Sequence, residues 1–416
     1  MGEILTKNGS ILIADGDVLT IEQSSGSGDT PAPEKDVNFI DYDGTIVYSY
    51  TKSEFASLSA MPANPTHTGL TAQGWNWSLA DAKTYVATYG KLWIGQMYIT
   101  SSGKTEIDIE LNDAGLLSPY LKIAINGTVT IDWGDGSTND TVTGTSLYTA
   151  IYTLHTYATT GNYTISIGVT SGSFTFYDYY ILSHTNSTGN TSRRYNTSVI
   201  AIRLGSGITS IDSSAFYYCY SLRSITIPGH ITSIGNRAFY FCYFLQSITI
   251  PSGVTSIGTK TAYSCSSLQS IAIPNTVTSI GLEAFRSCYS LQSVTIPNSV
   301  ISIGTDIFQY CYSMQNAIIP TSITSIEKYM FGDCSALQSI TIPNSITSIE
   351  EYAFYDCYSL YKLTFKSSTP PTVSSSSTFS YIPTDCIIYV PSGKLTDYTT
   401  ATNYPDPNTY TYVEET

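Results

Sequence analysis

Seven cysteines recur at a fixed interval of 23 residues, and this period constrains the fold of the C-terminal half more than any other feature. A strict period of this length is the signature of a repeat protein, in which a unit buries its apolar face only against its neighbours. The period predicts a stack of similar coils, an architecture used for binding more often than for catalysis. The cysteines are Cys219, Cys242, Cys265, Cys288, Cys311, Cys334 and Cys357.

The apolar residues of each unit keep register with its cysteine. Alternating runs such as Ile225-Thr226-Ile227-Pro228 indicate a short strand that ends at proline. With strands about 4.8 Å apart, seven units would extend roughly 30 Å. We expect a mainly β solenoid of seven units over residues 204–366. Its inward ladders are the residues three before each cysteine (Phe216, Phe239, Ala262, Phe285, Phe308, Phe331, Phe354), those three after it (Leu222, Leu245, Leu268, Leu291, Met314, Leu337, Leu360) and an isoleucine series (Ile211, Ile234, Ile257, Ile280, Ile303, Ile326, Ile349).

These motifs, from Ile208 to Phe365, resemble the BspA-like leucine-rich repeats of bacterial surface proteins and phage-encoded proteins. The resemblance implies a leucine-rich-repeat solenoid. Ala262 interrupts the phenylalanine ladder, so we expect a looser third unit. A last strand at 386–391 and a helix at 393–403 resemble the ends of such arrays, so residues 367–416 are predicted to cap the open end.

The cysteines are predicted to be buried, reduced thiols. The chain has no C-x-x-C pair, and His230 is the only histidine inside the array. A zinc site needs four ligands that converge on one point, whereas these thiols follow a line. We therefore expect no metal and no cofactor, and we expect Cys386, outside the register, also to be free.

Tyrosine is concentrated in the variable positions beside each cysteine. If phenylalanine and cysteine point inward, several of these tyrosines must line one outer edge of the stack. Tyrosine combines a large rigid contact area with a hydroxyl, and binding surfaces favour it. The alternative is that these side chains only fill space between coils. The candidate binding residues are Tyr217, Tyr218, Tyr220, Tyr240, Tyr243, Tyr263, Tyr289, Tyr310, Tyr312, Tyr355 and Tyr358.

Residues 102–185 are predicted to form a separate β domain. The run from Val129 to Ser137 (VTIDWGDGS), followed by His155 and Tyr157, resembles the PKD domain, an immunoglobulin-like β-sandwich. That resemblance implies a spacer or a contact module. Asp132 and Asp135 are calcium candidates, although acidic loops more often make turns. Residues 186–203 are a polar connector.

The N-terminal part divides into three segments. Residues 1–22 read as short strands with turns at Asn8-Gly9 and Asp15-Gly16, and resemble the attachment segments of some phage tail-associated proteins. Residues 23–36 have the composition of a flexible linker. Residues 37–101 are a small α+β module with strands near 38–40 and 45–48 and a helix from Ser78 to Tyr89 that ends at Gly90. Its tryptophans, Trp75, Trp77 and Trp93, are assigned to a core rather than to a ligand platform.

We do not expect an enzyme. Residues 41–45 (DYDGT) match the nucleophile motif of haloacid-dehalogenase phosphatases, but the chain lacks the doubly wound sheet that this chemistry requires. The motif is therefore interpreted as a turn between two strands. The histidines (His67, His155, His184, His230) have no recognisable nucleophile or metal partner, while a hidden carboxylate pair of glycosidase type would leave no local motif.

The net charge and its distribution disfavour some classes of binding partner. The net charge is −14, whereas the array is nearly neutral, with seven Lys or Arg and eight Asp or Glu between residues 201 and 362. Nucleic acid and anionic membranes are disfavoured because there is no basic stripe. The sequence shows no signal peptide and no apolar stretch long enough for a membrane helix.

We expect a phage or phage-tail protein that binds a glycan or protein of the bacterial host surface and attaches to other virion proteins through its N-terminal segment. The alternatives are a bacterial adhesin at the cell surface, which binds host matrix or other bacteria, and a structural virion decoration without a specific ligand. The sequence does not decide whether the chain forms a homo-oligomer.

Overall fold

The computed structural model describes residues 4–7, 10–13, 35–176, 181–183 and 198–415. The chain forms two compact units, Met1–Ala32 and Pro33–Thr416. In the first, β1 (Ile4–Lys7) and β2 (Ser10–Ile13) pair antiparallel, with Ile4 opposite Ile13. Two of the short strands expected in the N-terminal segment are therefore confirmed. The predicted turns at Asn8-Gly9 and Asp15-Gly16 and almost all of the linker lie outside the described residues.

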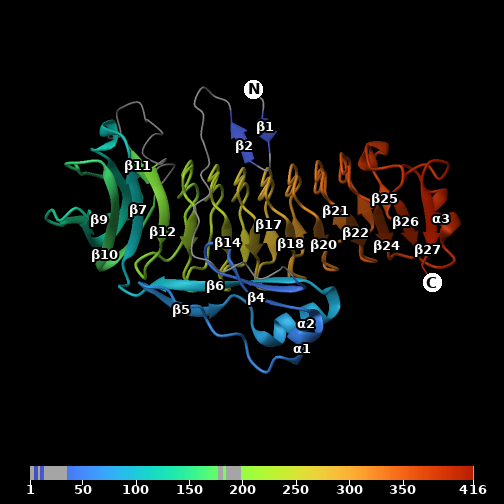
Figure 1. The fold of residues 1–416 in the computed structure, drawn as a ribbon, viewed down its shortest axis with the longest axis horizontal. Helices are drawn as coiled ribbons and strands as arrows, with labels where there is room; N and C mark the ends of the chain where they lie inside the picture. The colour runs from blue at the N-terminus through green and yellow to red at the C-terminus, as the bar shows by residue number, and fades with distance from the viewer. Residues whose placement is uncertain (1–3, 8–9, 14–34, 177–180, 184–197, 416) are drawn as a thin grey trace. The chain divides into compact units, whose positions relative to one another are not determined.

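The repeats of the second unit form a β-solenoid, and the chain is mainly β, as predicted. Each coil contributes one short strand to a parallel ladder in which Ser293 lies beside Asn316, one period later (Figure 1). The solenoid has about 9 turns, more than the seven cysteine-bearing units. The strands of this face are β12 (Val199–Arg203), β13 (Ser224–Thr226), β14 (Ser247–Thr249), β16 (Ser270–Ala272), β18 (Ser293–Thr295), β20 (Asn316–Ile318), β22 (Ser339–Ile342), β24 (Lys362–Phe365), β26 (Ile387–Val390) and β27 (Thr411–Glu414).

A second set of two-residue strands carries the predicted isoleucine ladder. Ile257, Ile280 and Ile303 pair in parallel, and isolated bridges extend the ladder back to Ile234 and Ile211. The strands are β15 (Ser256–Ile257), β17 (Ser279–Ile280), β19 (Ser302–Ile303), β21 (Ser325–Ile326), β23 (Ser348–Ile349) and β25 (Thr372–Val373).

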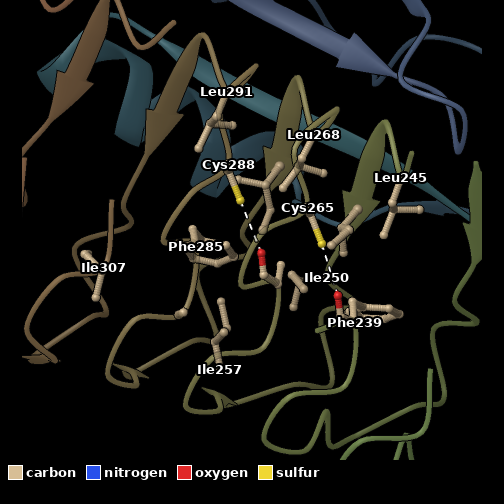
Figure 2. Packing of buried hydrophobic residues seen from close by; sticks show 14 of the residues in the cluster. Phe239, Leu245, Ile250, Ile257, Cys265, Leu268, Phe285, Cys288, Leu291 and Ile307 are labelled. Carbon is tan, nitrogen blue, oxygen red and sulfur yellow. Dashed lines mark hydrogen bonds between the residues drawn. The ribbon is translucent and has the colours of Figure 1, made fainter. Parts of the chain in front are cut away.

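Cysteine, phenylalanine and leucine fill the interior between these two faces, as predicted (Figure 2). All eight cysteines are free and buried. The thiol of Cys265 donates to the carbonyl of Phe239 at 3.2 Å, and Cys288 donates to Ala262 at 3.3 Å (Figure 2). The same contact recurs from Cys242 to Cys357, so each thiol ties its coil to the one before.

The phenylalanine ladder has one gap, at Ala262. Phe216 stacks on Phe239 with ring centroids 5.4 Å apart, and the ladder resumes at Phe285 and Phe308 with 5.8 Å. Phe379 adds a rung beyond the seventh unit, 5.7 Å from Phe354. Ala262 itself is fully buried, and the looser third unit expected there stays a prediction.

Residues 102–183 join the solenoid rather than standing apart from it. The described strands lie in one sheet of order β11-β8-β10-β7-β12-β13, with β9 on the other edge of β8. Because β12 pairs antiparallel with β7 and parallel with β13, this sheet continues directly into the coils. Its remaining elements are β7 (Thr105–Leu111), η1 (Ala114–Leu116), β8 (Tyr120–Asp132), β9 (Asp140–Leu154), β10 (Gly161–Thr175) and β11 (Leu182–Ser183).

Residues 37–100 form a four-stranded sheet of order β4-β3-β6-β5 with two helices. The predicted helix is confirmed: Ser78 caps its N-terminus by accepting from the Asp81 N–H, and Gly90 ends it at φ 87°. The interpretation of DYDGT as a turn is also confirmed, with Gly44 at φ 90°. The elements are β3 (Val37–Ile40), β4 (Ile46–Tyr50), α1 (Lys52–Ser57), β5 (Leu70–Trp75), α2 (Leu79–Tyr89) and β6 (Leu92–Thr100).

This module packs on the strand face of the solenoid. β6 contacts β13, β14, β16 and β18. The outward residues of β14, β16 and β18 are small (Ser247, Thr249, Ser270, Ala272, Ser293, Thr295) and are buried there. Trp75, Trp77 and Trp93 are all buried, which confirms their assignment to a core. The strand face of these coils is thus occupied by the chain's own N-terminal module.

Proline leaves carbonyls of this face without a backbone donor. Ile342 accepts a hydrogen bond from the Lys366 N–H of the next coil at 3.0 Å. At the equivalent positions the next coil has Pro274, Pro297 and Pro320, which carry no N–H. The carbonyls of Ile250, Ile273 and Ile296 therefore lack this partner.

Side chains of the module supply the missing donors. Asn76 Nδ2 donates to the carbonyl of Ile250 at 3.1 Å, and Trp77 Nε1 donates to Ile273 at 3.0 Å. Tyr85 donates its hydroxyl to Ile296 at 3.1 Å. One carbonyl on each of three consecutive coils thus pairs with one donor of the module. Buried carbonyls require such partners.

The C-terminal residues close the array as an irregular coil. η3 (Ser376–Phe379) precedes β26, and α3 (Leu395–Thr399) precedes β27, which pairs parallel with β26. The strand predicted at 386–391 is confirmed as β26, but it is not the last, because β27 pairs beyond it. The helix is shorter than the predicted span 393–403. In the described part of the chain, no helix is long and apolar enough to span a membrane.

The buried thiols should resist modification in the folded protein. Burial raises the pKa of Cys219 and Cys288, and the thiolate is the reactive form. We expect Ellman's reagent at pH 8 to detect no thiol in the native chain and eight per chain in guanidinium chloride. Rapid reaction of several thiols under native conditions would contradict the packing of the coils.

Replacing Asn76 should loosen the module. Asn76→Ala removes donors to Ile250 and Ala272 and the acceptor of the Gly95 N–H, leaving buried groups unpaired. We expect about 1–3 kcal/mol lower unfolding free energy, measured by chemical denaturation. The matched control is Asn112→Ala, at an exposed asparagine. Equal stability of the two variants would show that the module does not depend on these bonds.

Candidate binding surface on the solenoid

The turn around each cysteine sorts side chains between the interior and the outer edge. The residue before the cysteine has positive φ in every coil and is never glycine, for example 61° at Tyr218 and 64° at Tyr310. This conformation costs roughly 1–2 kcal/mol for such residues and persists only where neighbours hold it. Coil-to-coil hydrogen bonds do so: the Tyr218 N–H donates to Tyr240 at 2.9 Å.

As a result, the tyrosines lie on the outer edge while phenylalanine and cysteine face inward. We call this edge the tyrosine rim and define it by the residues two before, one before and one after each cysteine. Phe216 and Cys219 are almost completely buried, whereas Tyr217, Tyr218 and Tyr220 are half-buried. The predicted sorting of side chains is therefore what the structure shows.

The rim tyrosines stack on one another along the array. Tyr240 lies between Tyr217 and Tyr263, with centroid distances of 4.8 and 4.9 Å and interplanar angles of 3° and 18°. Tyr220 stacks on Tyr243 at 5.0 Å, and Tyr289 stacks on Tyr312 at 5.2 Å. In these stacks each ring face lies against the face of a neighbouring ring.

The eleven candidate residues occur in three groups. Coils one to three bring together Tyr217, Tyr218, Tyr220, Tyr240, Tyr243 and Tyr263, and Phe241 stacks there on Tyr218 at 5.3 Å. Tyr289, Tyr310 and Tyr312 follow on coils four and five, and Tyr355 and Tyr358 lie on coil seven. Tyr312 and Tyr358 are the most exposed of the set, at 42% and 58%. Burial raises the pKa of Tyr312 to about 12, so its hydroxyl stays protonated near neutral pH.

Sequence reasoning missed a further tyrosine pair. Tyr329 stacks on Tyr352 at 4.7 Å, and Lys328 lies 5.6 Å from one ring and 5.5 Å from the other. Both tyrosines lie five residues before a cysteine, at the other positive-φ position of the coil, with φ 51° and 61°. Tyr381, 61% exposed, continues the rim beside Tyr355. Extending the register comparison to that position would have found the pair.

The acidic candidates of the β domain serve local structure. Asp132 accepts from the Gly134 N–H at 3.0 Å, and Asp135 accepts from the Ser137 N–H and contacts His155 at 2.8 Å. The hydrogen bonds from Ser137 and then His155 hold the pKa of Asp135 low, at about 2. Where the structure describes the chain, no group of three or more His, Cys, Asp or Glu is arranged to hold a metal.

The phosphatase-like motif is likewise engaged in local contacts. Asp41 Oδ2 lies 2.6 Å from His67 Nε2, and Asp43 accepts from the Thr45 N–H at 2.9 Å. The sheet that carries it mixes parallel and antiparallel pairs in four strands. It is not the doubly wound sheet of that enzyme class.

Comparison with known proteins identifies the repeats. Residues 190–315 and 256–387 match the BspA type leucine-rich repeat region in six copies, over just under half of the chain. A search of curated proteins gave no match.

Three solved structures show partial likeness. A leucine-rich cell surface protein of Faecalibacterium prausnitzii is 28% identical, with a TM-score of 0.35, and the match covers 51% of this chain and 66% of that one, under two thirds. A leucine-rich repeat protein of T. pallidum is 24% identical with a TM-score of 0.35, covering 44% and 83%. One from Bacteroides ovatus is 23% identical with a TM-score of 0.36, covering 57% and 79%.

Loss of a central rim tyrosine should destabilise the array. Tyr240→Ala removes two stacking contacts, each worth about 0.5–1.5 kcal/mol beyond area burial. We expect about 1–3 kcal/mol lower unfolding free energy by chemical denaturation. Tyr148→Ala, at a tyrosine 84% exposed on β9, is the control and should change stability by less than about 0.5 kcal/mol. A neutral Tyr240→Ala would mean that the stacks do not stabilise the coils.

The seven-cysteine register, the inward ladders and the profile match converge on one conclusion: the repeat array of this chain is a BspA-type leucine-rich repeat solenoid.

Proposed function

We propose that the chain is a non-enzymatic adhesion protein that binds its target through the tyrosine rim. The observation that carries the proposal is the set of stacked tyrosines along one edge of a BspA-type array. A solenoid presents such a row on a rigid support, so little entropy is lost on binding. The strand face of coils two to four is covered by the module, whereas, among the described residues, the module is not seen to cover the rim of those coils.

The stacking geometry bears on the kind of target. Sugars commonly bind aromatic side chains through an exposed ring face, whereas most rim faces are covered by the next ring. Edges and hydroxyls instead suit hydrogen bonding to polar groups, as in protein–protein interfaces. Between the two expected targets, a surface glycan or a surface protein, this arrangement favours protein.

The chain is displayed either on a bacterial cell or on a phage particle, which we call its carrier. The BspA-type match favours display at a bacterial cell surface, where the target is host matrix or another bacterium. The small N-terminal unit, separate from the second unit by its contacts, would suit attachment to virion proteins. Immunogold labelling of the native source separates these carriers, because gold on intact cells and gold on tail structures are mutually distinguishable.

Adhesion should depend on the rim. Replacing Tyr220, Tyr243, Tyr289 and Tyr312 by Ser should reduce binding of the fluorescent chain to bacterial cells at least about tenfold, the loss of roughly 1.4 kcal/mol. The measurement is flow cytometry over a panel of cells, with protease-treated and periodate-treated cells to separate protein from glycan targets. Unchanged binding by the folded variant would refute the proposal.

Two controls separate binding from stability. Because these rings are stacked, their loss also weakens the coils, so the set is repeated with Phe, which keeps the stacks and removes only the hydroxyls. Tyr148→Ser, far from the repeats in sequence and highly exposed, should bind like the original chain.

A further inference from the structure

In the row of rim residues that directly follow each cysteine, Ser335 stands at a position where most coils have tyrosine. This row reads Tyr220, Tyr243, Ser266, Tyr289, Tyr312, Ser335 and Tyr358. Neighbouring rungs are 5.0–5.2 Å apart where both are tyrosine. Tyr312 and Tyr358 flank Ser335 and are two coils apart, which is about 10 Å at the usual strand spacing. A planar group placed midway would lie about 5 Å from each ring, within the range of aromatic stacking.

The gap at Ser335 is open, whereas the equivalent gap at Ser266 is closed. Ser266 and Ser264 are only 6% and 7% exposed. Ser335 is half-buried, and its flanking rings, Tyr312 and Tyr358, are the most exposed of the predicted rim tyrosines. One gap is therefore accessible to a ligand group.

Two carboxylates border the open gap. Asp333 and Asp356 each precede the cysteine of coils six and seven, and the corresponding residues at the closed gap are Ser264 and Ser287. Asp333 accepts a hydrogen bond from Gln309 Nε2 at 3.3 Å. Asp356 Oδ1 is buried and has no hydrogen-bond partner within the described part of the chain.

These carboxylates also lack cations. Some other acids of the array are in ion pairs, with Arg286 Nη1 3.2 Å from Asp306 and Lys328 Nζ 2.7 Å from Glu351. Among the residues that the structure describes, no ion pair involves Asp333 or Asp356. Burial raises the pKa of Asp333, and the nearby Asp356 carboxylate raises it further, while Arg286 lowers it. A cation from outside would relieve the repulsion between the two carboxylates.

We propose that the gap between Tyr312 and Tyr358 binds an arginine side chain of a polypeptide partner, with the guanidinium between the two rings and against Asp333 and Asp356. Arginine fits better than lysine because its guanidinium is planar, stacks on aromatic faces and bonds carboxylates in pairs. This inference rests on the proposed function, since it assigns one partner group to part of the tyrosine rim.

The direct test uses small probes on the full chain. N-acetyl-arginine amide, N-acetyl-lysine amide and N-acetyl-citrulline amide are titrated by ligand-observed NMR. We expect the arginine probe to bind at least about threefold more tightly than the lysine probe, and the neutral citrulline probe to show no saturable binding. Equal binding of all three probes, or none, would overturn the proposal.

Variants locate the site. Asp333→Asn and Asp356→Asn should each weaken the arginine probe about tenfold, the scale of one charge-assisted hydrogen bond. Ser335→Tyr restores the rung found on five other coils and should abolish binding. If that variant does not fold, as judged by thermal denaturation, the isosteric Asn variants decide. Asp397→Asn, an exposed acid in α3, is the charge control. Full binding by both rim Asn variants would contradict the site.

The outcomes separate this inference from the proposed function. If cell adhesion depends on the rim tyrosines while the arginine probe does not bind, the inference fails and the proposed function survives. If the probe binds and is lost in Asp333→Asn, but no rim variant alters adhesion, the inference survives and the proposed function fails.

Discussion

The fold depends on the hydrogen bonds that each coil makes to the next at the same register. Strand faces, turns and cysteine thiols all contribute such bonds, for example from the Tyr218 N–H to Tyr240 and from Cys265 Sγ to Phe239. No coil can be stable alone, because its backbone groups and its apolar face find partners only in its neighbours. A residue that interrupts this pairing in six successive coils therefore has a cumulative effect.

Proline is that residue, and it connects the array to the N-terminal module. The repeated Ile-Pro step ends each strand sharply, but it also removes one donor per coil. Asn76, Trp77 and Tyr85 restore donors on three successive coils, and the small outward residues of β14, β16 and β18 allow β6 to approach closely. The module is thus matched to the repeat by spacing as well as by chemistry. The turn side of the coils, where the tyrosines lie, is the side to which we assign partner binding in the proposed function.

Much of this architecture could be predicted from the sequence, because comparing the repeat units with one another shows which positions stay apolar. The inward positions of Phe216, Cys219 and Leu222 are fixed by a pattern repeated seven times, and the caps of α2 at Ser78 and Gly90 are local signals. The docking of the module is not local: nothing near Trp77 indicates that its indole N–H meets Ile273, 196 residues away. The sequence predicted a cap after Phe365 but not that β27 would extend the ladder beyond β26, because the pairing there advances 25 residues, from Lys362 to Ile387, and leaves the cysteine register.

For the candidate site, composition predicted which residues lie on the rim but not how they are arranged. That Tyr240 stacks between two rings, that Ser266 is covered while Ser335 is accessible, and that Asp356 keeps an oxygen without a partner all depend on side-chain packing between coils. The positive φ before each cysteine was likewise not visible, because residues such as Tyr218 and Phe241 ordinarily avoid that conformation.

The module that covers β13 to β18 also divides the array mechanically. Coils beneath it are clamped by a second set of bonds in parallel with their own, which reaches Thr321, just after β20. Among the described residues, no hydrogen bond joins the module to the coils from β22 onward. Under tension along the stack, the unclamped coils would peel first and dissipate energy one turn at a time. The clamped coils would stay folded. Under a pulling force the chain would therefore lengthen by unfolding its other coils before its attachment broke.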